Sequence, residues 1–329
     1  MRPPRRRTIV DSSPFPVLLA RSGGFTLVEI LSALVVLILI VGVISQVASM
    51  TIRATRMSNQ ALDAASQARL VFGRIGADIA GAVKRTDAPW DLQNPGKEGL
   101  YLRFLSAVPS EDGTAGASAN RGFSLVAYQI AAHADNNGRD CLVRAGKAIS
   151  RNMSGYLGLD AKGLPVRFTS AGFPAGLLPA SGEYDILSPG VIRMVVGYQL
   201  YPDNLQATLQ DGTVVPNARG QVVYSSPVRS VTPFGGGTVS VYPDLTRISA
   251  VVIGLVVIDA DNLKLMNAAQ VAALAGAFAD PTGNALPVGV WNTVANNPSA
   301  LPAAVPWPAR QAVRVFQCAF PLTPLDFKP

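Results

Sequence analysis

The first pattern along the chain is one long apolar stretch near the N-terminus. Residues 30–52 contain no charged side chain, and residues 30–44 are mostly Leu, Ile and Val. A helix rises about 1.5 Å per residue, so about 20 apolar residues span the ~30 Å hydrocarbon core of a bilayer. The pattern therefore predicts a transmembrane helix over about residues 25–48.

Beyond this stretch, the apolar positions recur at the spacing of an amphipathic helix. The stripe consists of Val47, Met50, Ala54, Met57, Ala61, Ala64, Ala68, Val71, Ile75 and Ile79. The charged side chains are expected off or beside it, at Arg53, Arg56, Asp63, Arg69, Arg74 and Asp78. No proline occurs between Pro16 and Pro89, so we predict one helix over residues 25–85. Its amphipathic half is expected to lie on a sheet, with a free coiled-coil dimer as the alternative.

From residue 86 to residue 329 the pattern changes to short β-like runs between turn residues. The candidate strands are rich in Val, Ile, Tyr and Phe and cover residues 100–107, 123–131, 141–149, 191–201, 249–259 and 312–319. Loops with short strands at 221–224 and 238–242 are expected over 202–247, a short helix over 267–279, and a long proline-rich loop over 281–310. A long N-terminal helix followed by an antiparallel sheet predicts an α+β fold.

Composition and charge exclude several classes of protein. The chain has 329 residues, of which 49% are hydrophobic and 15% charged, unlike a disordered chain. Its net charge of +7 comes largely from residues 1–24, which hold five arginines and one aspartate. The rest lacks any long Lys/Arg cluster, so the sequence does not indicate a nucleic-acid partner. The basic residues before the apolar stretch predict a cytoplasmic N-terminus and a body across the membrane.

A carboxylate, Glu29, stands at the edge of the apolar stretch. An ionisable group inside a membrane is costly and is a functional candidate for that reason. An ordinary secretory signal peptide is the alternative, because residues 47–49 (Val-Ala-Ser) could serve as a cleavage site. The length of the apolar run and the presence of Glu29 favour a retained helix.

Residues 24–29 read Gly-Phe-Thr-Leu-Val-Glu, after a basic segment and before the apolar run. This arrangement resembles the class III signal of type IV pilins and type II secretion pseudopilins. The resemblance implies a leader over residues 1–24, cleavage by a prepilin peptidase between Gly24 and Phe25, and methylation of the new N-terminal Phe25. It also implies that Glu29 acts in assembly.

Two roles for Glu29 follow from its position. The family role pairs its carboxylate with the Phe25 amine of a neighbouring subunit, because an unpaired charge in lipid is expensive. The alternative is that Glu29 only complements the N-terminus of its own helix. Many pilins carry a proline where this chain has Gln46, so a straighter helix is expected here.

A finer resemblance concerns the candidate strands. Residues 126–130 and 141–144, and the later runs 191–198 and 247–255, are similar to strands of J-type minor pseudopilins. The sequence is also similar to a pilin-like group named Verru_Chthon cassette protein C. Both resemblances are carried by short runs, and the turns between them differ.

We found no motif that indicates catalysis, a metal site or a cofactor. The chain has one histidine, His133, and two cysteines, which nearly exclude a multi-ligand zinc site. Residues 135–140 offer oxygens that could bind calcium, but an Asn-Gly turn between two strands explains them better. Residues 259–262 are interpreted as a strand end. Cys141 and Cys318 could form a disulfide outside the cytoplasm or remain buried thiols.

These observations lead to one functional hypothesis and two alternatives. The chain is expected to be a minor pilin or pseudopilin of the bacterial inner membrane, a non-enzymatic single-pass subunit with a periplasmic body. Its expected partners are other pilins, a prepilin peptidase and the inner-membrane assembly platform. The alternatives are a membrane-anchored extracytoplasmic binding protein and an exported enzyme.

Overall fold

The computed structural model describes residues 26–83, 90–93, 101–107, 124–148, 179–202, 206–209, 213–215, 220–224, 227–231, 240–243 and 247–322. The chain divides into two compact units, Met1–Thr55 and Arg56–Pro329. We call the second unit the body and describe each unit by itself. The expected leader, with Gly24 and Phe25, lies outside the described residues.

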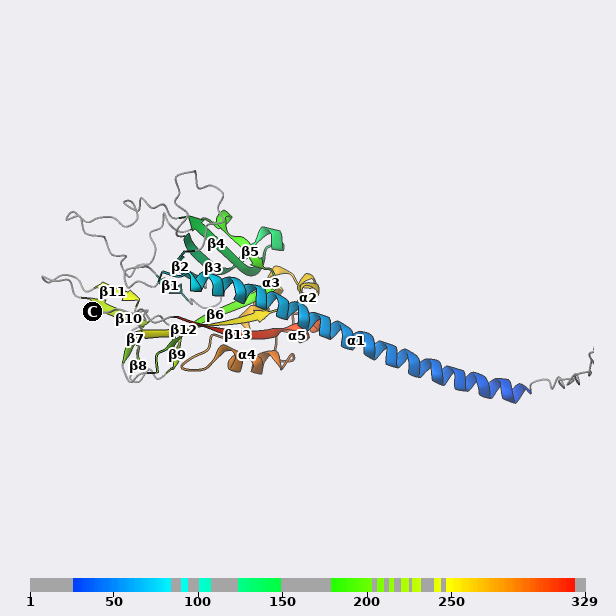
Figure 1. Ribbon diagram of the computed structural model, residues 1–329. Helices are drawn as coiled ribbons and strands as arrows, with labels where there is room; N and C mark the ends of the chain where they lie inside the picture. Colours follow the sequence, from blue (N-terminus) through cyan, green and yellow to red (C-terminus); the bar gives the residue numbers. More distant parts are fainter. Residues whose placement is uncertain are drawn as a thin grey trace, which may run out of the picture. The chain divides into compact units, whose positions relative to one another are not determined.

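One helix, α1, runs over Leu27–Ala80 (Figure 1). The predicted helix over residues 25–85 is therefore confirmed to within a few residues at each end. Thr26 caps its first turn, and a turn begins at Gly81. The first 29 helical residues belong to the N-terminal unit, and the remainder belongs to the body.

Within its described residues the body contains three antiparallel sheets, and the strands of each are named in their spatial order. The first comprises β1 (Trp90–Gln93), β2 (Tyr101–Ser106), β3 (Ser124–His133), β4 (Arg139–Ala148) and β5 (Asp185–Ser188). The second comprises β13 (Arg314–Pro321), β12 (Ile248–Val257), β6 (Val191–Leu200) and β9 (Val222–Val223). The third comprises β11 (Ser240–Pro243), β10 (Pro227–Val231), β7 (Ala207–Leu209) and β8 (Val214–Val215). The fold is α+β, as the sequence predicts.

The six long strand predictions are confirmed as β2, β3, β4, β6, β12 and β13, with shifted ends. Their runs of Val, Ile, Leu and aromatic residues are long enough to mark a strand without further information. The short strands β9 and β11 match the expectations for 221–224 and 238–242. The strands β7, β8 and β10 also lie in the region 202–247, where short strands are expected, but the sequence does not place them individually. The sequence does not predict β1 and β5, because four residues are too few to show alternation clearly.

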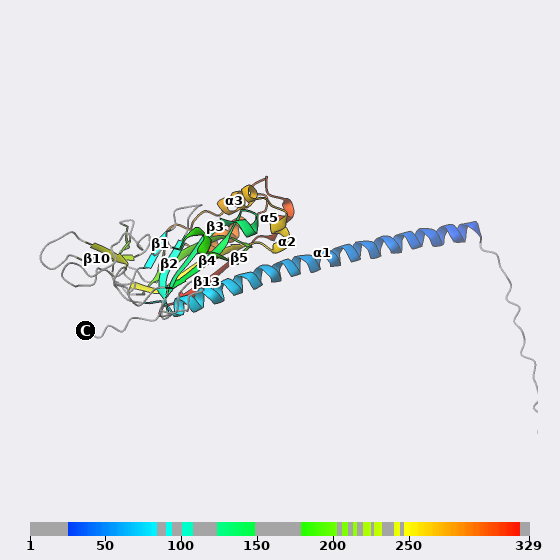
Figure 2. The ribbon, with the colours of Figure 1, turned by 90° about the horizontal axis from the view of Figure 1, so that it is seen from above.

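The core lies where α1 covers the first and second sheets. Ala64, Ala68, Val71, Ile75 and Ile79 on α1 are buried in one cluster with residues of both sheets. The other face of the second sheet carries four short helices, α2 (Ala260–Lys264), α3 (Ala268–Gly276), α4 (Pro287–Ala295) and α5 (Trp307–Ala312). Figure 2 shows α1 and α3 on opposite sides of the strands.

The alternation of β12 separates two clusters, because successive side chains of a strand point to opposite faces. Its residues 251, 253, 255 and 257 belong to the cluster that contains α1, whereas Val256 belongs to the cluster of the short helices. Gly254 lies on the face of the short helices, and a Cβ there would come within 2.5 Å of Pro287 Cβ. A glycine at this position thus lets α4 approach the sheet closely.

The prediction of a long loop over residues 281–310 is wrong. The segment contains α4 and the start of α5. Both helices carry proline in the first turn, where the missing N–H costs nothing. Trp291 anchors α4, with its ring fully buried and its Nε1 donating to the Ala279 carbonyl oxygen at 2.7 Å.

The expected helix over 267–279 is confirmed as α3, which Asn267 caps. The interpretation of residues 259–262 as a strand end is only partly right, because β12 ends at Val257 and α2 begins at Ala260. The expected turn at 135–140 is confirmed. Asn137 and Gly138 adopt positive φ values of 54° and 68° where β3 turns into β4.

Candidate functional site

At the N-terminal end of α1, Glu29 binds the first turn of its own helix. Its Oε2 accepts hydrogen bonds from the Thr26 backbone N at 3.0 Å and from Thr26 Oγ1 at 3.1 Å. The Glu29 backbone N donates in return to Thr26 Oγ1 at 3.3 Å. This reciprocal arrangement is a capping box, which satisfies backbone N–H groups that the helix cannot pair.

In the single chain, Glu29 therefore stabilises the N-terminus of its own helix, which is the alternative role given above. The carboxylate complements its own helix end, and this is a local consequence of a threonine three residues before a glutamate. The pairing of Glu29 with the Phe25 amine of a neighbour stays a prediction. The sequence itself carries the signal for the capping box, a threonine at 26 followed three residues later by a glutamate at 29.

The N-terminal half of α1 exposes large apolar side chains on all sides. The exposed fraction runs from 79% at Leu27 to 51% at Val35 and 53% at Ile52. Among the described residues, α1 is the one helix long and apolar enough to cross a membrane. This agrees with a membrane anchor, although a signal sequence has the same properties.

Several hydroxyl groups of this half bind the helix itself. Ser49 Oγ donates to the Ser45 carbonyl oxygen at 2.8 Å, and Thr51 Oγ1 donates to the Val47 carbonyl oxygen at 2.9 Å. Such bonds give these hydroxyl groups a partner without water. This reduces the number of polar groups that a lipid-exposed helix would leave without a partner.

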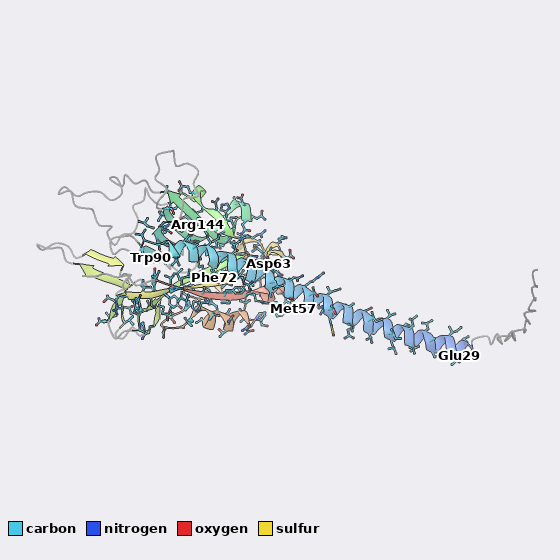
Figure 3. All side chains as sticks on the ribbon, viewed as in Figure 1. Glu29, Met57, Asp63, Phe72, Trp90 and Arg144 are labelled. Atoms are coloured by element: carbon cyan, nitrogen blue, oxygen red, sulfur yellow. The ribbon has the colours of Figure 1, made fainter. Side chains whose placement is uncertain are left out.

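In the body, α1 carries one completely buried carboxylate, Asp78, whose partner is Arg144 (labelled in Figure 3). Arg144 on β4 holds it with two bonds, from Nε to Oδ2 at 2.8 Å and from Nη2 to Oδ1 at 3.1 Å. The Tyr128 hydroxyl on β3 also donates to Asp78 Oδ2. Tyr128 and Arg144 lie opposite each other in the β3–β4 register, so the pair meets the carboxylate from adjacent strands.

Burial raises the pKa of the Tyr128 hydroxyl well above its ordinary value, and the neighbouring Asp78 charge acts in the same direction. The hydroxyl is thus a permanent donor to Asp78. The prediction that Asp78 lies off or beside the buried stripe is wrong. Asp78 follows Val71 by seven residues and Ile75 by three, and this spacing places it on the stripe. An acidic side chain is normally exposed, and this is why the sequence predicts Asp78 outside the stripe.

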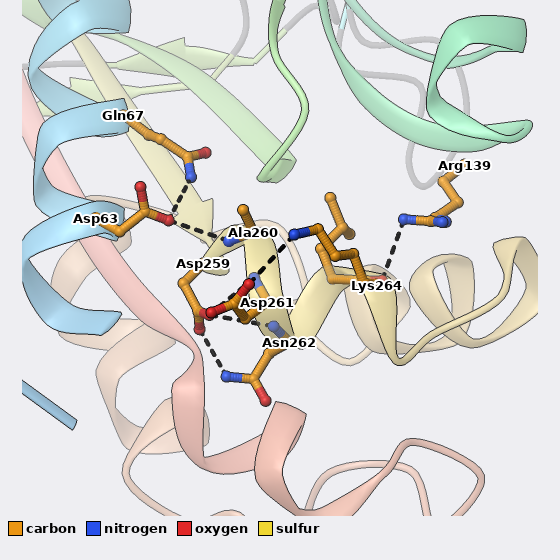
Figure 4. Close-up of polar contacts among 9 residues, drawn as sticks. Asp63, Gln67, Arg139, Asp259, Ala260, Asp261, Asn262 and Lys264 are labelled. Carbon is orange, nitrogen blue, oxygen red and sulfur yellow. Dashed lines mark hydrogen bonds and ion pairs between the residues drawn. The ribbon is translucent and has the colours of Figure 1, made fainter. Parts of the chain in front are cut away.

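A second set of polar contacts attaches α1 to the loop after β12 (Figure 4). Asp63 Oδ2 accepts from the Ala260 backbone N and from Gln67 Nε2, both at 3.0 Å. The Oε1 atom of Gln67 accepts from Ser188 Oγ at 3.0 Å. A Cβ at Gly190 would clash with Gln67 Oε1, so only glycine fits beside this contact.

The adjoining helix α2 is capped by the aspartate that precedes it. Asp259 Oδ1 accepts from the backbone N of Asp261 at 3.2 Å and of Asn262 at 3.1 Å. Asn262 Nδ2 donates to the other carboxylate oxygen at 2.7 Å. The acidic residues 259–261 therefore have a structural role in starting α2.

A groove of about 730 Å³ opens beside these contacts, between the start of the body segment of α1 and helices α2 and α5. Its lining includes Arg56, Asn59, Gln60, Asp261, Leu265 and Pro308. Over the described ranges, no group of three or more His, Cys, Asp or Glu residues could hold a metal ion. The lining is polar on the α1 side and partly apolar on the other.

Cys141 and Cys318 are free thiols in the structure, so it does not contain the disulfide considered above. Cys141 is buried on β4, in a cluster with Ala127 and Val143 that is separate from the core under α1. Cys318 is half-buried on β13, a strand of the second sheet, whereas β4 belongs to the first. Burial raises the pKa of the Cys141 thiol to about 11, which leaves it protonated at neutral pH.

His133 is a local structural residue. Its Nδ1 accepts from the Asp135 backbone N at 3.2 Å, which caps the short turn between β3 and β4. The imidazole is thus engaged with the backbone of its own turn, and this contact accounts for its position.

Comparisons with protein-family models, with curated proteins and with solved structures found no match for this chain. The functional interpretation therefore depends on the sequence motif and on the geometry described above.

Proposed function

We propose that the chain is a pilin-like subunit, a minor pilin or pseudopilin of a type IV pilus-like or type II secretion assembly. One observation carries the proposal. The Gly-Phe-Thr-Leu-Val-Glu motif of residues 24–29 leads into the first turn of one helix, whose first half is largely apolar on all sides and whose second half is packed in an α+β body.

The geometry of Glu29 supports a role in assembly. After removal of residues 1–24, the Phe25 amine would be a cation at the edge of the hydrocarbon region. Glu29 of a neighbouring subunit would neutralise it, and the capping box with Thr26 would hold the carboxylate until then. Exchange of a capping contact for an ion pair keeps the carboxylate hydrogen-bonded throughout, which limits the cost of its position in lipid.

The proposal includes partners and a location. A prepilin peptidase would process the chain, and other pilins and the assembly platform of the bacterial inner membrane would receive it. The body would lie in the periplasm, with the N-terminus facing the cytoplasm. Within this family we favour a J-like minor pseudopilin, because of the strand runs around Tyr128 and Val251.

The test compares the full chain with two variants in bacterial membranes that contain the partner pilins. N-terminal sequencing is expected to find Phe25 as the first residue in all three chains. Glu29→Leu should insert normally yet lose crosslinking to partner pilins, because the partner amine is then unpaired. Thr26→Val is the matched control, since it removes the hydroxyl of the capping box and keeps the carboxylate, so its crosslinking should persist.

Four results would contradict the proposal or the role of Glu29 within it. A chain that starts near Met50 would indicate an exported protein, and an unprocessed chain in the membrane would indicate a plain anchor. Equal crosslinking of the Glu29→Leu variant and the wild type would remove the assembly role. Loss of crosslinking in both variants would assign the effect to the helix end and not to the charge.

A further inference from the structure

One end of the body combines an unpaired cation with exposed apolar side chains. There, residues 56–63 of α1 lie beside α2 and α5 (Figure 1), and the groove described above opens between them. Its carboxylates all have partners. Asp63 and Asp259 bind backbone N–H groups of the loop and helix α2, and Asp261 Oδ1 lies 3.3 Å from Lys264 Nζ.

Arg56 differs from these groups, because it has no hydrogen bond or ion pair to any residue that the structure describes. Asn59, one turn further along the same helix, offers an amide to the same space. The unsatisfied charge of the groove is therefore positive, and the ligand that complements it is an anion with several acceptor oxygens.

The rim of the groove is apolar and aromatic. Leu265 belongs to the lining and is 55% exposed. Trp307 is 48% exposed and is the residue before Pro308, which also belongs to the lining. The Arg310 guanidinium lies 5.1 Å from the centre of the Trp307 ring. An exposed indole beside cationic side chains is typical of the membrane–water interface, where the ring is at headgroup level and the charges reach phosphates.

The chain connects this groove closely to the apolar run. Arg56 follows Ile52, the last residue of the uncharged run, by four residues in the same helix, which is about 6 Å along the helix axis. The polar headgroup layer adds roughly 5–8 Å to each side of the hydrocarbon core. With the span predicted over about residues 25–48, Arg56 follows the end of the span by only eight residues, so the chain itself keeps this residue of the groove near the bilayer surface.

We propose that this end of the body binds the lipid surface, with Arg56 on a phospholipid phosphate and with Trp307 and Leu265 in the interface. The inference rests on the membrane anchor within the proposed function, and it requires neither processing nor assembly. It assigns a role to α2 and α5, whose buried side chains belong to the cluster on the other face of the second sheet. Lipid contact at this point would limit rotation of the body about its anchor.

The test uses tryptophan fluorescence of the full chain in lipid nanodiscs. Trp90 and Trp291 are buried in the body, so the emission lost in Trp307→Phe reports Trp307. A nitroxide on the lipid headgroup is expected to remove roughly half of that emission, and a nitroxide at the end of the acyl chain much less. Acrylamide in the water should quench Trp307 less in nanodiscs than in detergent.

Arg56→Gln tests the phosphate contact, and Arg69→Gln is the matched control on the exposed face of the same helix. The Arg56→Gln chain should lose a large part of the headgroup quenching, whereas the Arg69→Gln chain should keep it. The inference would be overturned if the headgroup nitroxide did not quench Trp307 and acrylamide quenched it equally in nanodiscs and in detergent. Equal headgroup quenching in the two arginine variants would also overturn it.

Two further measurements separate this failure from failure of the proposed function. Retention of the chain in membranes after alkaline extraction tests the anchor, and its loss would overturn both proposals. A retained and processed chain without headgroup quenching would overturn only the lipid contact. Protection of Trp307 that requires added partner pilins would assign the groove to a protein interface instead.

Discussion

The two halves of α1 have the same backbone and opposite surroundings. In residues 26–55 the polar side chains that form hydrogen bonds bind their own helix, as Thr26 and Glu29 do in the capping box. In the half that belongs to the body they bind other elements, as Asp63 and Asp78 do. The first half is complete as a helix but leaves its apolar surface uncovered, whereas the second depends on the sheets.

This difference shows that helix formation and burial are separate properties. The second half buries a stripe that begins with the small residues Ala64 and Ala68 and continues with larger ones from Val71 onward. Small side chains let the helix approach the sheets, and larger ones fill the space further along. In the first half such a gradation is absent, because the large apolar side chains there are exposed and have no sheet to fit.

The sharpest test of the comparison places the same charge in each half. Ile75→Asp should lower the free energy of unfolding of the body by more than about 4 kcal/mol, because it buries a carboxylate without a partner. Leu37→Asp, at a position 58% exposed, should leave that free energy unchanged and weaken membrane insertion instead. Denaturant unfolding of the full chain in micelles, followed by tryptophan fluorescence, measures the first effect. Similar losses in the two variants would contradict the division.

The next effect concerns the buried ion pair. Asp78→Ala should cost about 3–5 kcal/mol, because Arg144 is 3% exposed and would keep its charge in the core. The double change Asp78→Leu with Arg144→Met should cost less than Asp78→Ala, since the buried Arg144 charge is removed together with the carboxylate and only the partly exposed Arg74, 3.7 Å from Asp78 Oδ1, loses an ion pair. The same unfolding experiment checks both. A double variant less stable than the single variant would show that the pair itself stabilises the fold.

The smallest effect compares two polar residues near the boundary between the halves. Asp63→Ala should cost about 1 kcal/mol, because the Ala260 N–H loses its acceptor. Thr55→Ala should leave the stability of the body unchanged, since the Thr55 hydroxyl binds only the Thr51 carbonyl oxygen of its own helix. Hydrogen exchange at the Ala260 amide gives a local readout, which should accelerate only in the Asp63 variant. Faster exchange in both would show that the helix acts as one cooperative element across the boundary.

Local pattern was sufficient for the elements that extend over many residues. The uncharged run, the stripe at intervals of three and four, and the absence of proline after Pro16 together predicted α1. The long strands were equally visible, because their alternation with turn residues is a property of the chain itself. Glu29 was recognised as a site candidate for the same reason, since its place at the edge of an apolar run needs no tertiary information.

The proline-rich segment shows where local pattern misleads. Proline interrupts a helix in its interior but suits the first turn, and the sequence does not say which of these applies at Pro287 and Pro308. The packing of Trp291 and the space above Gly254 decide that α4 forms there. Both depend on residues that are far away in the chain.

The sequence by itself determined the long helix, the strand-rich body and the motif at residues 24–29. Only the tertiary structure decided that Asp78 is buried, that Cys141 and Cys318 belong to separate sheets, and that Arg56 shares a groove with α2 and α5. The reason is the range of the interactions involved. Periodicity and capping act within a few residues and are written in consecutive positions, whereas the partner of a buried charge is chosen by strand pairing between distant segments.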